Sequence, residues 1–212
     1  MKLLTVTPES RSEVVRETAE CLRAGGIALI PTDTVYGLAA HPGQSAAVAR
    51  IFGIKGRQAD KPIALLAADL DAVERHGAEL APAARRLAEA FWPGALTLVV
   101  PCGGTFEGFR VPDHPFVREL LAACGGVLRV TSANRSGAAP AASAEEALRD
   151  VGLEVDVAVD AGPCPGGVPS SVVKVSAASV DVLRPGALPA DRLLQAGNGA
   201  PPDSRPPDAA PG

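Results

Sequence analysis

Two short polar segments carry residue types that could bind a nucleotide phosphate. One is Lys55-Gly56-Arg57, in which two cations flank a glycine. Glycine lets a bound group approach the backbone closely, arginine can hold two phosphate oxygens at once, and lysine acts as a point charge. The other is Thr131-Ser132-Ala133-Asn134, which offers a hydroxyl and an amide at the end of an apolar run. Together the two segments predict the two halves of a nucleotide-phosphate site.

The placement of lysine favours this interpretation. The chain holds 20 basic residues, and only four of them are lysines. Two of the four, Lys55 and Lys61, fall within seven residues of each other. In a chain that otherwise uses arginine, clustered lysines indicate a need for a compact ammonium. The alternative is a solvated, charged loop.

A third segment could bind a second ligand. An apolar run over residues 27–30, typical of a buried strand, leads straight into Pro31-Thr32-Asp33-Thr34-Val35-Tyr36-Gly37-Leu38. Ligands gather outside the strand ends of open α/β sheets, so the hydroxyls of Thr32 and Thr34 are candidate contacts. The alternative is an ordinary turn, because Asp and Thr readily bond to nearby backbone.

Three further polar features adjoin apolar strands. They are Arg110, the pair Ser170-Ser171 after a loop rich in Gly and Pro, and Arg184. Each could instead be a surface residue, because arginine is mostly exposed. The chain has neither a G-x-G-x-x-G nor a Walker A sequence, and no serine lies in a G-x-S-x-G elbow. Since no nucleophile–base pair is evident, these residues suit a reaction that depends on positioning and charge stabilisation.

Composition limits the class of protein. The chain has 212 residues, 47% of them apolar and 3% aromatic, which is enough for one domain with a core built mainly from Ala, Val and Leu. Its net charge of −4 argues against broad, non-specific nucleic-acid binding. The four cysteines have no CxxC or zinc-ligand spacing. No apolar run is long enough for a signal peptide or a membrane span, so we expect a soluble, cytoplasmic protein.

Helix-like and strand-like segments alternate along the chain, which predicts an α/β fold. A short strand pair over residues 96–100 and 108–111, and late strands with no helix between them, favour some antiparallel pairing. We therefore expect a twisted mixed sheet with flanking helices. One domain should span residues 1–195, and residues 196–212 should form a disordered tail, because they include no large apolar residue to bury. The expected helices cover residues 8–24, 45–52, 82–91, 115–124 and 144–149, and further strands cover 63–66, 127–131, 155–159, 171–175 and 180–183.

Six segments in a fixed order resemble those of a known family. Three of them are the polar segments described first, and the others are Phe91-Trp92-Pro93-Gly94-Ala95-Leu96-Thr97-Leu98, Arg110-Val111-Pro112-Asp113-His114-Pro115 and Leu183-Arg184-Pro185-Gly186. Over about residues 8 to 188, the chain resembles the YrdC-like threonylcarbamoyl-AMP synthases. The resemblance implies a twisted mixed sheet with helices around a concave, positively charged cleft.

The resemblance also implies an activity. Such enzymes are nucleotidyltransferases that combine L-threonine, bicarbonate and ATP into threonylcarbamoyl-AMP and pyrophosphate. A partner enzyme then transfers the threonylcarbamoyl group to an adenosine beside the anticodon of certain tRNAs. By position, Lys55 and Arg57 would be catalytic; Lys55, Arg57, Ser132, Asn134 and Arg184 would bind ATP; and Thr32, Thr34, Lys61, Arg110 and Ser171 would hold L-threonine. No residue is predicted to ligate a metal, but Mg²⁺ is expected to bridge phosphate oxygens.

The chain departs from the family pattern in two places. The strand after Ser170-Ser171 reads Val172-Val173-Lys174, where family members often have Thr after the Ser, so either serine could contact threonine. Longer members add a second domain, whereas here only the tail follows. Two alternatives remain open: a YrdC-like module that binds nucleotide or RNA without making the adenylate, and a carbamoyl-transfer domain. The expected partners are the three substrates and the downstream transferase, with weak RNA contact at most and no membrane.

Overall fold

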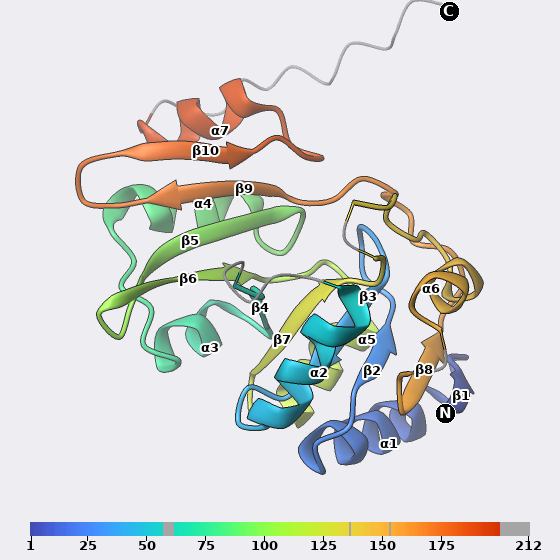
Figure 1. The fold of residues 1–212 in the computed structure, drawn as a ribbon. Helices are drawn as coiled ribbons and strands as arrows, with labels where there is room; N and C mark the ends of the chain where they lie inside the picture. The colour runs from blue at the N-terminus through green and yellow to red at the C-terminus, as the bar shows by residue number, and fades with distance from the viewer. Residues whose placement is uncertain (57–61, 136, 153, 200–212) are drawn as a thin grey trace, which may run out of the picture.

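The computed structural model describes residues 1–56, 62–135, 137–152 and 154–199. A ten-stranded sheet extends through this part of the chain (Figure 1). Its strands in chain order are β1 (Lys2–Thr5), β2 (Ala28–Ile30), β3 (Gly37–Ala40), β4 (Leu65–Ala67), β5 (Leu96–Cys102), β6 (Thr105–Arg110), β7 (Val127–Ser132), β8 (Val157–Asp160), β9 (Ser171–Val175) and β10 (Val180–Arg184).

The spatial order of the strands differs from their chain order. It runs β1-β8-β2-β3-β7-β4-β6-β5-β9-β10. Four neighbouring pairs are parallel, namely β1–β8, β8–β2, β4–β6 and β5–β9, and the other five are antiparallel. The predicted mixed sheet is therefore confirmed, as are its antiparallel pairs β5–β6 and β9–β10.

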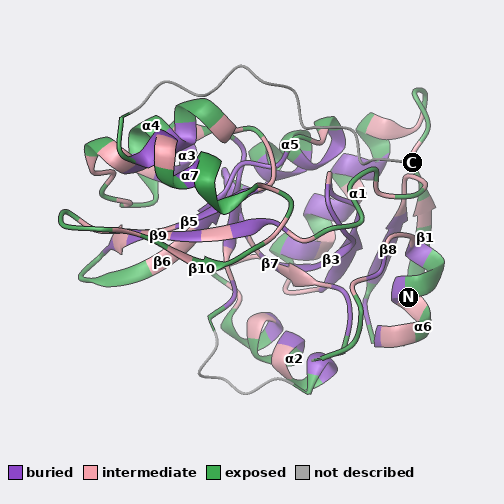
Figure 2. Ribbon diagram, turned by 90° about the horizontal axis from the view of Figure 1, so that it is seen from above, coloured by how far each residue is buried: buried purple, intermediate pink, exposed green. Residues whose placement is uncertain are grey.

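Helices cover both faces of the sheet. They are α1 (Arg11–Arg23), α2 (Ser45–Lys55), α3 (Leu70–Arg75), α4 (Pro82–Phe91), α5 (Pro115–Ala123), α6 (Ala144–Val151) and α7 (Ala190–Gly197). The buried residues of α2 and α6 belong to one apolar cluster, and those of the other five helices belong to a second cluster. Figure 2 shows α2 on one side of the sheet and α3, α4 and α5 on the other.

Alternation along the strands separates the two clusters. Leu29 and Leu38 join the cluster beneath α2 and α6, whereas Ala28, Ile30 and Ala39 join the opposite one. This is the period of two that a strand imposes on its side chains. In both β2 and β3 every residue is buried, because these strands lie in the interior of the sheet with helices on both faces.

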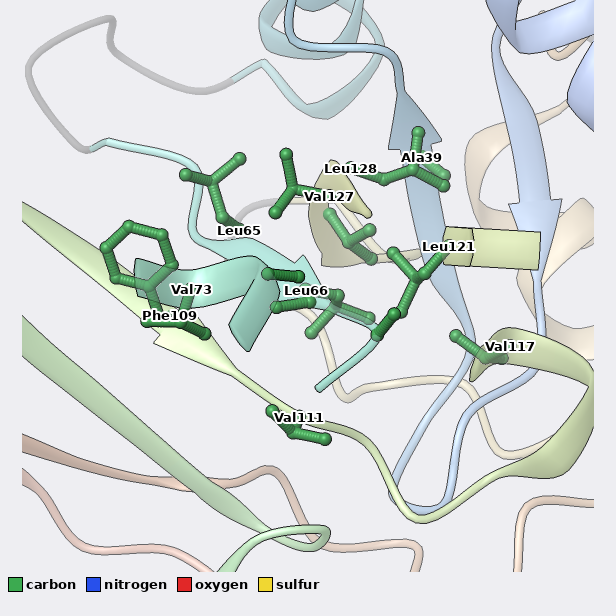
Figure 3. Close-up of a cluster of buried hydrophobic side chains, with 14 of the residues drawn as sticks. Ala39, Leu65, Leu66, Val73, Phe109, Val111, Val117, Leu121, Val127 and Leu128 are labelled. Atoms are coloured by element: carbon green, nitrogen blue, oxygen red, sulfur yellow. The ribbon is translucent and has the colours of Figure 1, made fainter. Parts of the chain in front are cut away.

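The larger cluster anchors the half of the sheet that carries β4, β6 and β7. Figure 3 shows Leu65, Phe109 and Leu128 of these strands beside Val73 of α3 and Leu121 of α5. All five side chains are fully buried. Packing on this face leaves the opposite face of the same strands available for a ligand cavity.

Several elements differ from the sequence-based expectation. Strands β1 and β3 and helices α3 and α7 were not predicted. α1 begins at Arg11 rather than at residue 8, because Thr7 and Ser10 exchange backbone-to-hydroxyl hydrogen bonds in a turn before it. α7 includes Ala196 and Gly197, which are the first two residues of the predicted tail. Residues 200–212 of the expected tail lie outside the described residues. Among the described helices, none combines the length and apolar character that a bilayer span requires.

Candidate active site

A cavity of about 570 Å³ lies against the face of β5 and β6 that points away from the larger apolar cluster. Alternate residues of two strands form its floor. Thr97, Val99 and Arg110 line the cavity, whereas Leu98 and Phe109 point into the core. Strand alternation thus brings the polar side chains of two largely apolar strands into one space.

The cavity brings together most of the described residues that the sequence predicts as ligand contacts. Thr32, Thr34, Arg110, Ser132, Asn134 and Arg184 all line it. Lys55 and Ser171 are not among the lining residues. The predicted contacts Arg57 and Lys61 lie outside the described residues.

The hydroxyl of Thr32 forms hydrogen bonds within its own loop. Its hydroxyl donates to the carbonyl of Val35 at 2.7 Å. The same oxygen accepts from the backbone N–H groups of Thr34 and Val35, at 3.1 and 3.2 Å. A hydroxyl has one proton to donate, so Thr32 shapes the loop and keeps no donor for a ligand.

Thr34 retains capacity for a ligand. Because the proton of Thr32 goes to Val35, Thr34 does not accept from Thr32 across the 3.0 Å contact between the two hydroxyl oxygens. Thr34 Oγ1 accepts from Arg110 Nη1 at 2.8 Å. A hydroxyl oxygen has two lone pairs, so one acceptor position remains on Thr34 for an N–H or O–H group in the cavity.

Arg110 is buried and held through three of its nitrogens. Besides the bond to Thr34, Nε donates to the carbonyl of Gly94 at 2.9 Å, and Nη2 forms an ion pair with Asp33 Oδ1 at 2.6 Å. The side chains of Arg110 and Asp33 are only 7% and 11% exposed. Charge-assisted bonds of this kind are stronger than neutral ones, so the guanidinium has a fixed orientation in the cavity wall.

Tyr36 joins this segment to the loop rich in Gly and Pro. Its hydroxyl donates to the carbonyl of Gly162 at 2.7 Å and accepts from the N–H of Ala161 at 3.3 Å. Burial raises the pKa of Tyr36 to about 12, so the donated proton is present at neutral pH. Further along the loop, the N–H of Gly167 donates to the carbonyl of Thr34 at 2.8 Å. The loop is therefore fastened to the threonine-bearing segment at two points.

Lys55 lies at the end of α2 and supports the segment after β7. Its ammonium donates to the carbonyl of Ser132, to the carbonyl of Asn134 at 2.7 Å, and to Asn134 Oδ1 at 3.4 Å. Lys55 is only 4% exposed. α2 ends here because Gly56 adopts a left-handed conformation, with φ of 57°, which glycine tolerates best. The ammonium thus fixes the backbone that presents Ser132 and Asn134 to the cavity.

The two adjacent serines differ in role. Ser170 lines the cavity, and its Oγ lies 2.8 Å from Thr97 Oγ1. Ser171 is fully buried; its hydroxyl donates to the carbonyl of Leu188 at 2.7 Å and accepts from the N–H of Leu188 at 3.0 Å. Ser170 is therefore the serine that faces the cavity, because neighbouring residues in extended chain face opposite ways, and the contact predicted for Ser171 stays a prediction.

Arg184 reaches the same part of the cavity from β10. Its Nη2 donates to the carbonyl of Ser170 at 2.7 Å. Arg110 and Arg184 are the charged side chains among the described lining residues, which include no carboxylate, imidazole or thiol. This part of the lining is therefore suited to hold anionic groups but offers no ligand set for a divalent metal.

Sequence reasoning missed two residues of this site. Thr97 is a single hydroxyl between Leu96 and Leu98 in an apolar strand, and its alternation with core residues could have indicated it. Asp33 lies in the segment from Pro31 to Leu38, but its ion pair with Arg110 joins residues that are 77 positions apart. Nothing in the local sequence indicates such a pair.

A family model for Sua5, YciO and YrdC proteins, described as "Telomere recombination", matches residues 20–186. The chain belongs to this family. The matched range includes every described residue that lines the cavity, and the predicted resemblance to the Sua5/YrdC family is confirmed.

Two relatives support this membership over most of the chain. A Mycobacterium tuberculosis relative is 36% identical over 198 residues, which cover 89% of this chain and 91% of the relative. A Bacillus subtilis protein named threonylcarbamoyl-AMP synthase is 33% identical over 190 residues, which cover 84% of this chain and 55% of the relative.

A solved structure of the Sua5/YrdC family has the same fold. The crystal structure of P. abyssi Sua5 complexed with L-threonine matches with a TM-score of 0.84 at 32% sequence identity. The match covers 92% of this chain but 60% of that one. This chain thus spans little more than half the length of the Bacillus relative and of P. abyssi Sua5.

Proposed function

We propose that this chain is a threonylcarbamoyl-AMP synthase, a nucleotidyltransferase that combines L-threonine, bicarbonate and ATP. The observation that carries the proposal is that one cavity holds two kinds of polar group. Arg110 and Thr34 can recognise an amino acid, and Ser132 and Asn134 present hydrogen-bonding groups at a strand end. The name of the B. subtilis relative and the L-threonine complex of P. abyssi Sua5 support this activity.

At the amino-acid end, Arg110 is proposed to bind the carboxylate of threonine, since arginine suits bidentate carboxylate recognition. The free acceptor position on Thr34 would receive an N–H of the threonine amine. Ser170 takes the place that the sequence assigned to Ser171 and is proposed to face the same substrate. Thr32 contributes by holding the loop and not by direct contact.

At the nucleotide end, ATP is proposed to lie against Ser132 and Asn134, with Arg184 toward its negative charge. Lys55 would not touch ATP directly. It would hold Ser132 and Asn134 in position through the backbone carbonyls that it binds. Arg57 and Lys61 lie outside the described residues. Arg57 is proposed to bind the phosphates of ATP, and Lys61 is proposed to bind threonine.

The proposed reaction has two steps. The threonine amine and bicarbonate first give a carbamate and water. A carbamate oxygen then attacks the α-phosphorus of ATP, a phosphorus–oxygen bond breaks, and pyrophosphate leaves. Negative charge gathers on both sides of this displacement, so fixed cations and close positioning can supply the catalysis.

Further partners follow from the proposed reaction. Because the described lining has no carboxylate, Mg²⁺ is proposed to arrive on the phosphates of ATP and to neutralise their charge. The product would pass to a transferase that modifies tRNA, with at most weak contact between this chain and RNA. We expect the reaction to take place in the cytoplasm, where ATP and tRNA are available.

One assay tests the proposal and its alternatives. We expect the purified chain to release pyrophosphate only when ATP, L-threonine and bicarbonate are all present, and threonylcarbamoyl-AMP to appear by mass spectrometry. Tight ATP binding without turnover would instead indicate a nucleotide-binding module. Activity with carbamoyl phosphate in place of threonine and bicarbonate would indicate a carbamoyl-transfer domain.

A further inference from the structure

The arginine proposed to bind the threonine carboxylate already holds a carboxylate of this chain. Asp33 Oδ1 lies 2.6 Å from Arg110 Nη2, and both side chains are almost fully buried. Asp33 belongs to the segment between β2 and β3, and Arg110 belongs to the end of β6. Their contact therefore joins two segments that lie far apart in the chain.

Asp33 does not exhaust the donors of Arg110. A guanidinium has five N–H donors. Three of them go to the carbonyl of Gly94, the hydroxyl of Thr34 and the carboxylate of Asp33. Within the described part of the chain two donors remain, which is the number that a bidentate carboxylate contact requires.

The ion pair also lowers the cost of placing Arg110 in this site. A buried cation that loses its charged partner is strongly disfavoured, because its desolvation is no longer offset. Without Asp33, the neutral Gly94 carbonyl and Thr34 hydroxyl would be the remaining described acceptors of Arg110. The guanidinium would then be expected to turn toward solvent and lose its alignment with the substrate.

Asp33 is itself held firmly. The loop rich in Gly and Pro packs on its backbone, since a Cβ at Gly166 would lie 2.7 Å from the Asp33 carbonyl oxygen. The next residue, Thr34, accepts the N–H of Gly167 through its carbonyl at 2.8 Å. A carboxylate on a fixed backbone can transmit a fixed orientation to the side chain that it binds.

We infer that Asp33 is a positioning residue, which orients Arg110 so that its two remaining donors meet the carboxylate of L-threonine. This inference rests on the proposed function, because it takes threonine to be the amino-acid substrate. It adds a residue that would act through Arg110 without touching the substrate, and it assigns a purpose to the acidic residue between the two threonines.

The test compares the affinities of L-threonine and L-threonine amide, which lacks the carboxylate, by calorimetry. The wild type should prefer L-threonine. In Asp33→Ala we expect this preference to fall by about tenfold or more, in line with the loss of a charge-assisted contact, while ATP affinity stays within about twofold. Asp33→Asn keeps an acceptor oxygen and should lie between the two; it also carries the test if the alanine variant does not fold.

Asp113→Asn is the matched control, because it removes an exposed carboxylate from the loop after Arg110. It should keep the wild-type preference. The inference is overturned if Asp33→Ala keeps the preference, or if it weakens both ligands equally, as a purely structural role would. The proposed function has a separate readout: if the wild type binds no L-threonine, the function and this inference both fail.

Discussion

The ammonium of Lys55 lies 2.7 Å from the backbone carbonyl of Asn134, a residue 79 positions further along the chain. A second bond reaches the carbonyl of Ser132. The ammonium of Lys55, at the end of α2, therefore holds the backbone after β7 in place. Ser132 and Asn134 both line the cavity, so Lys55 supports the wall against which ATP is proposed to lie.

Replacement of Lys55 by alanine should therefore slow the reaction severely. We expect Lys55→Ala to release pyrophosphate about 10²-fold more slowly, comparable with the removal of one preorganised charge-stabilising group. Lys2→Ala is the control, since Lys2 is exposed and pairs with Glu17 at the surface, where ion pairs contribute little. A wild-type rate in a folded Lys55→Ala variant would contradict the assigned role.

The two serines should separate in their effects. Ser170→Ala is expected to raise the KM for threonine by about tenfold, the effect of one lost hydrogen bond to a charged group. Ser171→Ala should leave this KM unchanged and lower the free energy of unfolding by about 1–3 kcal/mol, because the Leu188 backbone loses both its bonds. Steady-state kinetics and urea unfolding would measure the two effects, and the reverse pattern would show that the residues are misassigned.

Gly186 should resist replacement. A Cβ there would lie 2.5 Å from the carbonyl oxygen of Pro169 and from the carbonyl carbon of Ser170. Gly186→Ala must therefore shift the backbone that carries Ser170, and we expect a loss of stability of about 1–3 kcal/mol together with reduced activity. Gly53→Ala is the matched change: Gly53 lies within α2, and no heavy atom of the other described residues lies within 4 Å of the added Cβ, so the change should stabilise the protein by up to about 1 kcal/mol. Equal thermal midpoints for the two variants would refute this account.

His114 should make stability depend on pH. Within the described part of the chain its buried Nδ1 has no hydrogen-bond partner, and burial lowers the pKa of His114 below its usual value. The unfolded chain then binds the proton more readily, so stability should fall as pH drops below about 6.5, by at most about 1.4 kcal/mol per pH unit.

Urea unfolding between pH 7 and pH 5 would measure this slope. His114→Asn should flatten the curve relative to the wild type, whereas His41→Asn should retain the slope because it leaves His114 in place. An unchanged slope in His114→Asn would assign the pH dependence to other groups.

The sequence predicted much of the fold because its main signals are local. The proline at the start of α4 and the glycine pair after α1 mark helix ends, and the apolar run of β2 is typical of a buried strand. β3 escaped prediction because Gly37, Leu38, Ala39 and Ala40 include no β-branched or aromatic residue. It is a strand because β2 and β7 pair with it on both sides, which is a tertiary effect.

The candidate site was also predicted in part from local signals, and the rest of it depends on tertiary structure. Motif order brought Thr34, Arg110, Ser132 and Asn134 to one cavity, as the structure places them. The choice between adjacent serines depended on which face of the chain meets the sheet, and a shift of one residue reverses that choice. Local sequence does not determine such a register.

The strand order has a consequence for synthesis of the protein on the ribosome. Lys2 in the first strand pairs with Val157, and at about 5–20 residues per second the ribosome needs roughly ten to thirty seconds to supply that partner. The cavity is complete only after Arg184 has emerged. Until then the nascent chain holds an unpaired strand edge and uncovered apolar side chains, which is the condition in which chaperones bind and in which slow codons would prolong exposure to aggregation.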